Sequence, residues 1–128
     1  MAHADAYAGP SVTDQRARAQ ALLGSALMAL GVAGFFYNGD FTSNARAHDD
    51  VLGLFRVNGW ENTLYIATGA LLLTSRSWAI PFAALYVALA IWGFVLGSGH
   101  SILSILPVNT AANVLHLGLA LAALAAAR

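Results

Sequence analysis

Two short stretches of the sequence place amide, carboxyl, phenol and imidazole side chains at the start of an apolar segment. One reads VNGWENTLY (residues 57–65) and the other VNTAANVLH (residues 108–116). Aligned, they share V-N-x-x-x-N-x-L followed by Tyr65 or His116, and similar apolar helix ends, LGVAGFF and LAIWGFV, precede them. The pattern predicts a duplicated two-helix unit, in which each copy presents its polar side chains along one helical stripe.

The deeper polar residues of the two stripes are the candidate site. They are Asn62, Tyr65, Asn113 and His116. If a twofold axis relates the units, the stripes face each other and these side chains form one polar cluster within a membrane bundle. The favoured interpretation is polar glue between helices, because buried amides in lipid need partners and a neutral histidine needs only one. The alternative is a site for a ligand, a proton or a tetrapyrrole, since an ionisable residue inside a membrane suggests a function.

The shallower polar residues of the motif are typical of helix capping. Asn58 and Asn109 stand where a loop gives way to a helix, so their side chains can accept from free backbone N–H groups of the first turn. Glu61 follows Asn58 by three positions, which is the spacing of a capping box and places a carboxylate near a helix N-terminus. We therefore predict a structural role for Glu61.

The composition indicates an integral membrane protein. The 128-residue chain is 59% hydrophobic and only 9% charged, whereas soluble domains carry about a quarter charged residues. The mean hydropathy is +0.66. The formal net charge is zero, so no basic patch supports nucleic-acid binding, and the absence of cysteine excludes disulfides and thiolate chemistry. The expected surroundings are a lipid bilayer and other transmembrane subunits or further copies of the chain.

Apolar segments predict an all-α fold: an integral membrane four-helix bundle in one domain, 17–128, after a flexible N-terminal tail, 1–16. The expected helices are about 17–37, 60–74, 79–97 and 110–127. About 20 residues are needed to cross the hydrocarbon core, so the second helix is the weakest candidate. Small residues at every fourth position predict close helix contacts: Ser25, Ala29, Ala33, Gly118, Ala122 and Ala126.

Arginine distribution predicts the orientation. One side of the bundle would carry Arg16, Arg18, Arg76 and Arg128, and the other Arg46 and Arg56. The positive-inside rule then places both termini in the cytoplasm. Each two-helix unit begins and ends on the same side, so the two units are expected to be parallel repeats.

The second connection on the opposite side, GSGHSILSILP (residues 97–107), has the pattern of a short amphipathic helix in the interface. A metal site made of His48, Asp49, Asp50 and His100 is conceivable, but no paired ligand spacing fixes its geometry, so we expect a solvated loop and no metal.

The runs LGLFRVNGWENTLYIATGALLL and VNTAANVLHLGLALAAL, each after a helix containing Gly-Phe, resemble a bacterial, mainly actinobacterial, four-helix membrane family. That family is catalogued as domain of unknown function 4383, and the resemblance spans about residues 17–125. It implies a multi-pass protein of the bacterial inner (plasma) membrane, without an established activity. The family motif usually reads V-N-x-x-H-N-x-x-H-L. Here Glu61, Tyr65 and Ala112 replace histidines and only His116 remains, which implies that any histidine-dependent metal or haem binding is lost.

No acid, base and nucleophile converge in the sequence, so we expect a non-enzymatic protein without a cofactor. The favoured function is an accessory or scaffold subunit that packs against a larger membrane complex, such as an electron-transport or photosynthetic assembly. The alternative is a small-solute or proton transporter, or a pigment- or haem-binding protein, that uses the polar cluster and, for a tetrapyrrole, His116.

Overall fold

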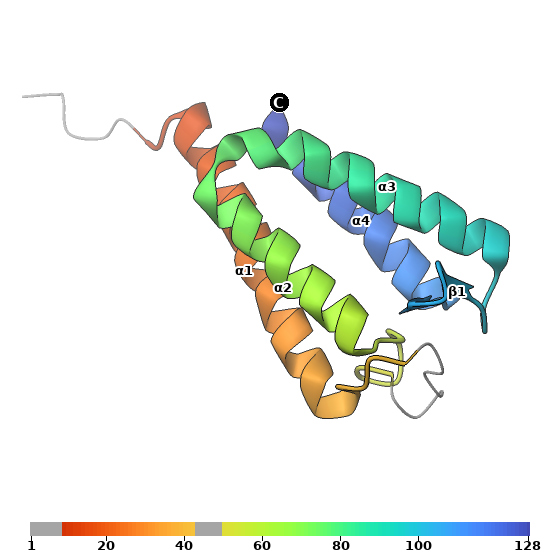
Figure 1. The fold of residues 1–128 in the computed structure, drawn as a ribbon. Helices are drawn as coiled ribbons and strands as arrows, with labels where there is room; N and C mark the ends of the chain where they lie inside the picture. Colours follow the sequence, from red (N-terminus) through yellow and green to blue (C-terminus); the bar gives the residue numbers. More distant parts are fainter. Residues whose placement is uncertain (1–8, 43–49) are drawn as a thin grey trace, which may run out of the picture.

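The computed structural model describes residues 9–42 and 50–128, and within them the chain is mostly helical (Figure 1). The helices are α1 (Val12–Tyr37), α2 (Gly59–Thr74), the 3-10 turn η2 (Arg76–Trp78), α3 (Ala79–Leu96) and α4 (Thr110–Ala127). Three segments are long and apolar enough to cross a membrane: α1, η2 together with α3, and α4. Helix α2 has only 16 residues, in keeping with its shorter apolar run.

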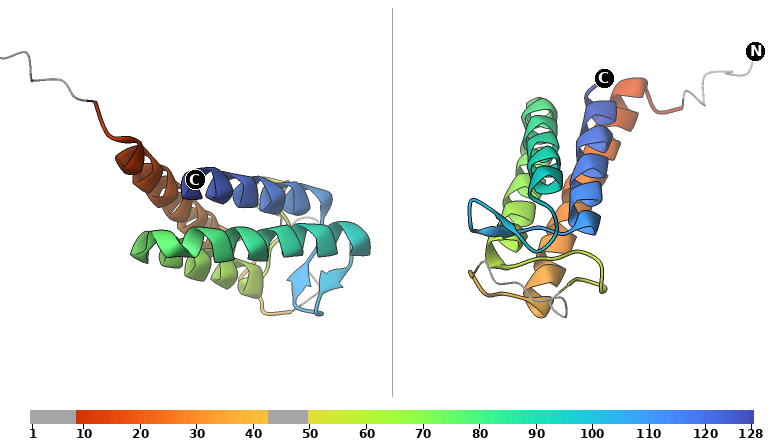
Figure 2. Two further views of the ribbon diagram at one scale, coloured as in Figure 1. Left: turned by 90° about the horizontal axis from the view of Figure 1, so that it is seen from above. Right: turned by 90° about the vertical axis from the view of Figure 1, so that its right-hand side faces the viewer.

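The helices form two antiparallel pairs. Helix α1 packs along α2 and α3 packs along α4, while η2 joins the pairs by a short connection. The pairs approach each other near η2 and diverge towards the opposite end, where the longer connections lie (Figures 1 and 2). We call the end with η2, the start of α1 and the end of α4 the arginine end, and the other the loop end.

The loop end is closed by two tight turns. At residues 51–54 and 102–105, Leu54 N–H donates to the Val51 carbonyl and Ile105 N–H to the Ile102 carbonyl, both at 3.0 Å. The second turn joins strands β1 (Ser101–Ile102) and β2 (Leu106–Pro107). The amphipathic helix predicted for residues 97–107 is therefore wrong. Leu103 and Ser104 adopt φ of 52° and 60°, a left-handed turn conformation incompatible with a continuing helix.

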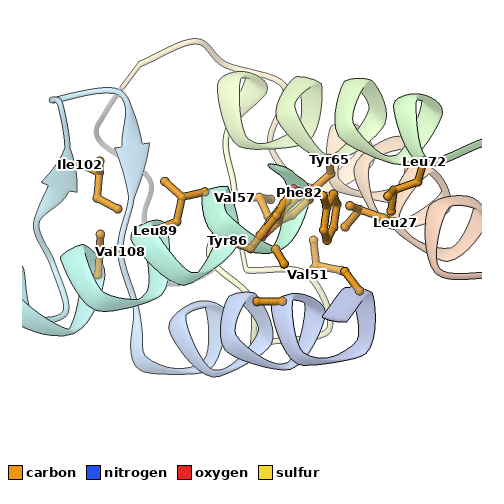
Figure 3. Packing of buried hydrophobic residues seen from close by; sticks show 13 residues of the cluster. Leu27, Val51, Val57, Tyr65, Leu72, Phe82, Tyr86, Leu89, Ile102 and Val108 are labelled. Carbon is orange, nitrogen blue, oxygen red and sulfur yellow. The ribbon is translucent and has the colours of Figure 1, made fainter. Parts of the chain in front are cut away.

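Side chains from these turns complete the hydrophobic core. Val51 and Ile102 belong to one continuous buried cluster, which extends to Leu27 and Leu72 at the arginine end. Figure 3 shows Val57, Tyr86 and Phe82 in the middle of this cluster. The loop end is thus part of the packed core, and its position is fixed by apolar burial.

Helices α1 and α2 touch through glycine. A Cβ atom added to Gly24 would lie 2.7 Å from the Gly69 carbonyl oxygen, and one added to Gly69 would lie 2.6 Å from the Gly24 carbonyl oxygen. The prediction that Ser25 and Ala29 form the contact was wrong, because both are exposed and the buried face of α1 contains Gly24, one position before Ser25. Gly118 of the second predicted stripe likewise has no neighbour within 4 Å of an added Cβ.

Helix α1 begins earlier than the sequence predicted. Its N-cap is Ser11, whose hydroxyl accepts from Asp14 N–H at 3.1 Å, while Asp14 Oδ2 accepts from Ser11 N–H at 3.2 Å. This capping box starts the helix at Val12 instead of near residue 17, so the predicted tail, 1–16, includes the first helical turn. Residues 1–8 of that tail lie outside the described residues.

Candidate functional site

A buried group of three polar side chains joins the two helix pairs. His116 Nε2 on α4 lies 2.9 Å from Glu61 Oε1 and 2.9 Å from the Tyr65 hydroxyl, both on α2. The three residues are 3%, 1% and 0% exposed, respectively. Glu61 and Tyr65 are four positions apart and therefore point the same way from α2, toward α4. We call Glu61, Tyr65 and His116 the polar triad.

Glu61 does not play the role predicted from its position. Asn58 Oδ1 accepts from Glu61 N–H at 2.9 Å, so the cap of α2 is present, but the Glu61 carboxylate does not complete a capping box. It turns inward to His116 instead. A glutamate at position N3 of a helix can turn back to the N-cap or inward to the core. Here it turns inward, because the buried imidazole of His116 needs a hydrogen-bonding group to replace the water lost on burial. The sequence signal was His116 itself, which needed a partner.

The predicted cluster of four residues is only half formed. Tyr65 and His116 meet, but Asn62 and Asn113 lie elsewhere. Asn62 Nδ2 donates to the Asn38 carbonyl at 2.8 Å. Successive helical residues are about 100° apart, so Asn62 faces around α2 from Glu61, toward α1.

Each of these two asparagines packs against a glycine of the neighbouring helix. A Cβ at Gly34 of α1 would overlap the Asn62 amide, and one at Gly93 of α3 would overlap the Asn113 amide. Each amide therefore lies within its own helix pair, in the space left by the missing side chain, and does not cross to the other pair.

Two residues that were not among the predicted site residues, Tyr86 and Thr68, lie beside the triad. Tyr86 of α3 shares a 2.9 Å hydrogen bond between its hydroxyl and Thr68 Oγ1 of α2. The centroid of the Tyr86 ring lies 5.4 Å from that of the His116 ring, and the centroid of the Tyr65 ring lies 5.9 Å from it. Both pairs of rings meet edge to face. His116 is thus held between two tyrosines. The phenol of Tyr86 within the apolar run of the third segment was the available signal.

The N-cap asparagines also tie the two halves together. Asn58 Nδ2 donates to the Ile105 carbonyl at 2.6 Å, and Asn109 Nδ2 donates to the Leu54 carbonyl at 2.6 Å. Asn109 Oδ1 accepts from Ala112 N–H at 2.9 Å, as Asn58 does in its own helix. Each amide therefore caps its helix and binds the turn that precedes the other helix.

Substituting Asn109 by aspartate should separate these two functions. Asn109→Asp keeps an acceptor for Ala112 N–H but loses the donor to the Leu54 carbonyl and sets two oxygens against each other. We expect a loss of about 0.5–1.5 kcal/mol of unfolding free energy, the usual net contribution of one hydrogen bond, because this bond is exposed. Thermal unfolding in detergent, followed by circular dichroism, measures it. Asn109→Ser also keeps the cap, and its unfolding free energy should fall as far if the lost hydrogen bond to Leu54 is the cause. Wild-type stability in both variants would contradict a role for this hydrogen bond.

The triad has two buried atoms without a hydrogen-bond partner. They are Glu61 Oε2 and His116 Nδ1. Residues 9–42 and 50–128 hold no group of three or more His, Asp or Glu side chains that could bind a metal. Of the conceivable loop site, His48 and Asp49 lie outside the described residues, and Asp50 pairs with Arg56 at 3.0 Å.

A tetrapyrrole does not fit His116 in this arrangement. Its Nε2 is engaged by both Tyr65 and Glu61, and the whole residue is 3% exposed. The other ring nitrogen, Nδ1, has no hydrogen-bond partner but is buried. An axial ligand needs a ring nitrogen that faces an open space, so binding through either nitrogen would require the helices to separate.

Three helices able to cross a membrane, with polar side chains turned to the interior, indicate a helical membrane protein. The chain belongs to the family described as domain of unknown function (DUF4383), whose model matches residues 18–128. The resemblance found in the sequence is thereby confirmed. No curated protein and no solved structure matches the chain.

Proposed function

We propose that the protein is a non-enzymatic accessory or scaffold subunit of a larger complex, such as an electron-transport or photosynthetic assembly, in the bacterial inner membrane. The observation that supports this function is the direction of its side chains. The buried polar groups of the bundle bond mainly to the protein's own helices and turns, while many large apolar side chains point outward. A protein built in this way offers surface for contact and little for chemistry.

The exposed apolar surface is densest near the loop end. Phe36 at the end of α1 is 87% exposed and Val95 at the end of α3 is 80% exposed. Trp92 and Phe94 lie in the same part of α3 and are 43% and 48% exposed. Aromatic side chains at this level of a helix either anchor it at the membrane interface or pack against another subunit. These residues are where we expect the partner to bind.

Two features support a parallel repeat of two-helix units in this proposal. The turns at 51–54 and 102–105 have the same hydrogen bond, and Asn58 and Asn109 make equivalent bonds to them. We further propose that both termini are cytoplasmic. Arg16, Arg18, Arg76 and Arg128 all belong to the arginine end. Because the chain has no cysteine, single cysteines at Ser77 and Ser98 test this topology by labelling with a membrane-impermeant maleimide. From the periplasmic side, only Ser98→Cys should react.

Purification in a mild detergent from the native membrane tests the function. We expect larger membrane subunits at a fixed stoichiometry by mass spectrometry, and a photocrosslinking residue at Phe36 or Val95 should give one protein adduct of defined mass. The same photocrosslinking amino acid in place of Leu22 serves as the matched control, because Leu22 is 71% exposed but far from the loop end. A protein that purifies alone and crosslinks only to lipid contradicts the accessory role.

A second candidate, proton handling, is supported by one observation: Glu61 Oε2 and His116 Nδ1 are buried and unpartnered, so the triad has unused capacity to bind a proton. Conduction would also need a polar route to the arginine end, where the buried side chains include the apolar Leu27 and Leu72 and one amide, Gln20. Proton flux into liposomes that falls in Glu61→Gln would favour this candidate over the scaffold.

A further inference from the structure

A groove at the arginine end runs between the start of α1 and the end of α4. It holds about 450 Å³ and is separate from the polar triad. Its lining residues are Val12, Gln15, Arg16, Ala19, Ala122, Ala125 and Ala126. Four alanines make the floor shallow and apolar, because no long side chain fills the space between the two helices.

The polar side chains of the groove lie toward one end. Gln15 and Arg16 are on the second turn of α1, and Ala19 lies one turn deeper into the bundle. On α4, Ala126 is near the end of the helix and Ala122 is one turn deeper. Inward from Val12 at the start of α1, a cationic and hydrogen-bonding region of Gln15 and Arg16 is followed by an apolar part at Ala19 and Ala122. This order matches the head and the acyl chain of a phospholipid.

Among the described residues, the positive charge of this end exceeds the negative charge. Within the described residues, the arginine end carries Arg16, Arg18, Arg76 and Arg128 against a single acid, Asp14, and none of these arginines makes an ion pair. Asp14 Oδ2 is instead engaged by Ser11 in the cap of α1. Arg16 is the one arginine of this set that is partly buried, and it lines the groove.

We propose that this groove binds one anionic phospholipid, with its phosphate on the Arg16 guanidinium and an acyl chain along Ala19 and Ala122. A guanidinium presents paired donors that match phosphate oxygens, and basic pockets between helices on the positively charged side of a membrane protein recognise anionic headgroups. The unpaired positive charge of this end favours a headgroup with net negative charge over a zwitterionic one. This inference is independent of the partner complex and of the triad.

Native mass spectrometry with added phosphatidylglycerol or phosphatidylcholine tests the site. We expect one phosphatidylglycerol per chain to be retained in preference to phosphatidylcholine. Arg16→Gln should weaken its retention about fivefold, the effect of losing one arginine contact near a membrane surface. Arg76→Gln removes the same charge from the same end but outside this groove, and it should retain the lipid.

A second variant tests the shape of the groove without changing charge. Ala122 is exposed, so Ala122→Leu can be accommodated in the fold while its side chain fills the apolar part of the groove. It should reduce retention of the lipid as Arg16→Gln does, with unchanged helical circular dichroism. Equal loss in Arg16→Gln and Arg76→Gln would reveal only diffuse charge attraction and overturn the site. Equal retention of both lipids, or a dimer of the chain without lipid that Ala122→Leu dissociates, would also overturn it.

Discussion

Gly69→Ala should destabilise the protein by about 2 kcal/mol or more, in spite of the better helix propensity of alanine. The added methyl group would lie 2.6 Å from the Gly24 carbonyl oxygen, 2.8 Å from Met28 Cγ and 3.0 Å from Met28 N. Met28 Cγ can move, but the carbonyl and the amide belong to the backbone of α1. The two helices must therefore separate along their contact, with loss of packing around Gly24 and Leu72.

Unfolding by a denaturing detergent, followed by circular dichroism, measures this effect. Gly118→Ala is the matched control, because an added Cβ there has nothing within 4 Å, so that it should be neutral or stabilising by up to about 1 kcal/mol. Both substitutions add one methyl group to a helical glycine and differ only in what it meets. If Gly69→Ala were as stable as Gly118→Ala, the close contact of α1 and α2 would be wrong.

Replacing Glu61 and His116 together should cost less stability than the sum of the two single replacements. Glu61→Leu leaves the His116 imidazole without its carboxylate partner in the core, and His116→Leu leaves a buried carboxylate, so each should lose about 3–5 kcal/mol of unfolding free energy. In the double variant neither the carboxylate nor the imidazole is left behind, and of the triad only the Tyr65 hydroxyl loses its partner. We expect the double variant to be more stable than the sum of the single effects allows, by about 1–3 kcal/mol.

The double-mutant cycle is measured by the same unfolding experiment. Glu61→Gln supports it, because the amide keeps the shape and can still hydrogen-bond to Nε2, so its loss should be smaller than that of Glu61→Leu. Asp40→Asn, an exposed acid at the loop end, controls for the loss of a negative charge and should have little effect. Strictly additive single effects would contradict a direct contact between Glu61 and His116.

The same variants separate polar glue from a functional site. If the triad only joins the helix pairs, any loss of the purified complex should follow the loss of stability, in the single and the double variants alike. If the triad handles protons, proton flux should be lost in every variant that stays folded. The first outcome is expected from the proposed scaffold role.

The amino-acid sequence by itself determined the helices and their polar faces. Apolar runs of about 18 residues placed α3 and α4 within one residue of their observed bounds, because a helix in lipid must satisfy its own backbone. The Val-Asn motif indicated the N-cap positions of Asn58 and Asn109, since capping depends only on neighbouring residues. Family membership also followed from the sequence.

Only the tertiary structure decided which polar side chains meet. Glu61 and Asn62 are neighbours in the sequence, yet Glu61 bonds to His116 of the other helix pair and Asn62 packs against Gly34 of its own. About 100° of helix rotation separates them, and spacing along one helix does not reveal which face a partner helix will cover. The close approach of α1 and α2 at Gly24 and Gly69 could not be predicted from the sequence for the same physical reason. The same holds for the contacts of the two turns. They depend on how four helices fill a shared volume, and that is a property of all of them together.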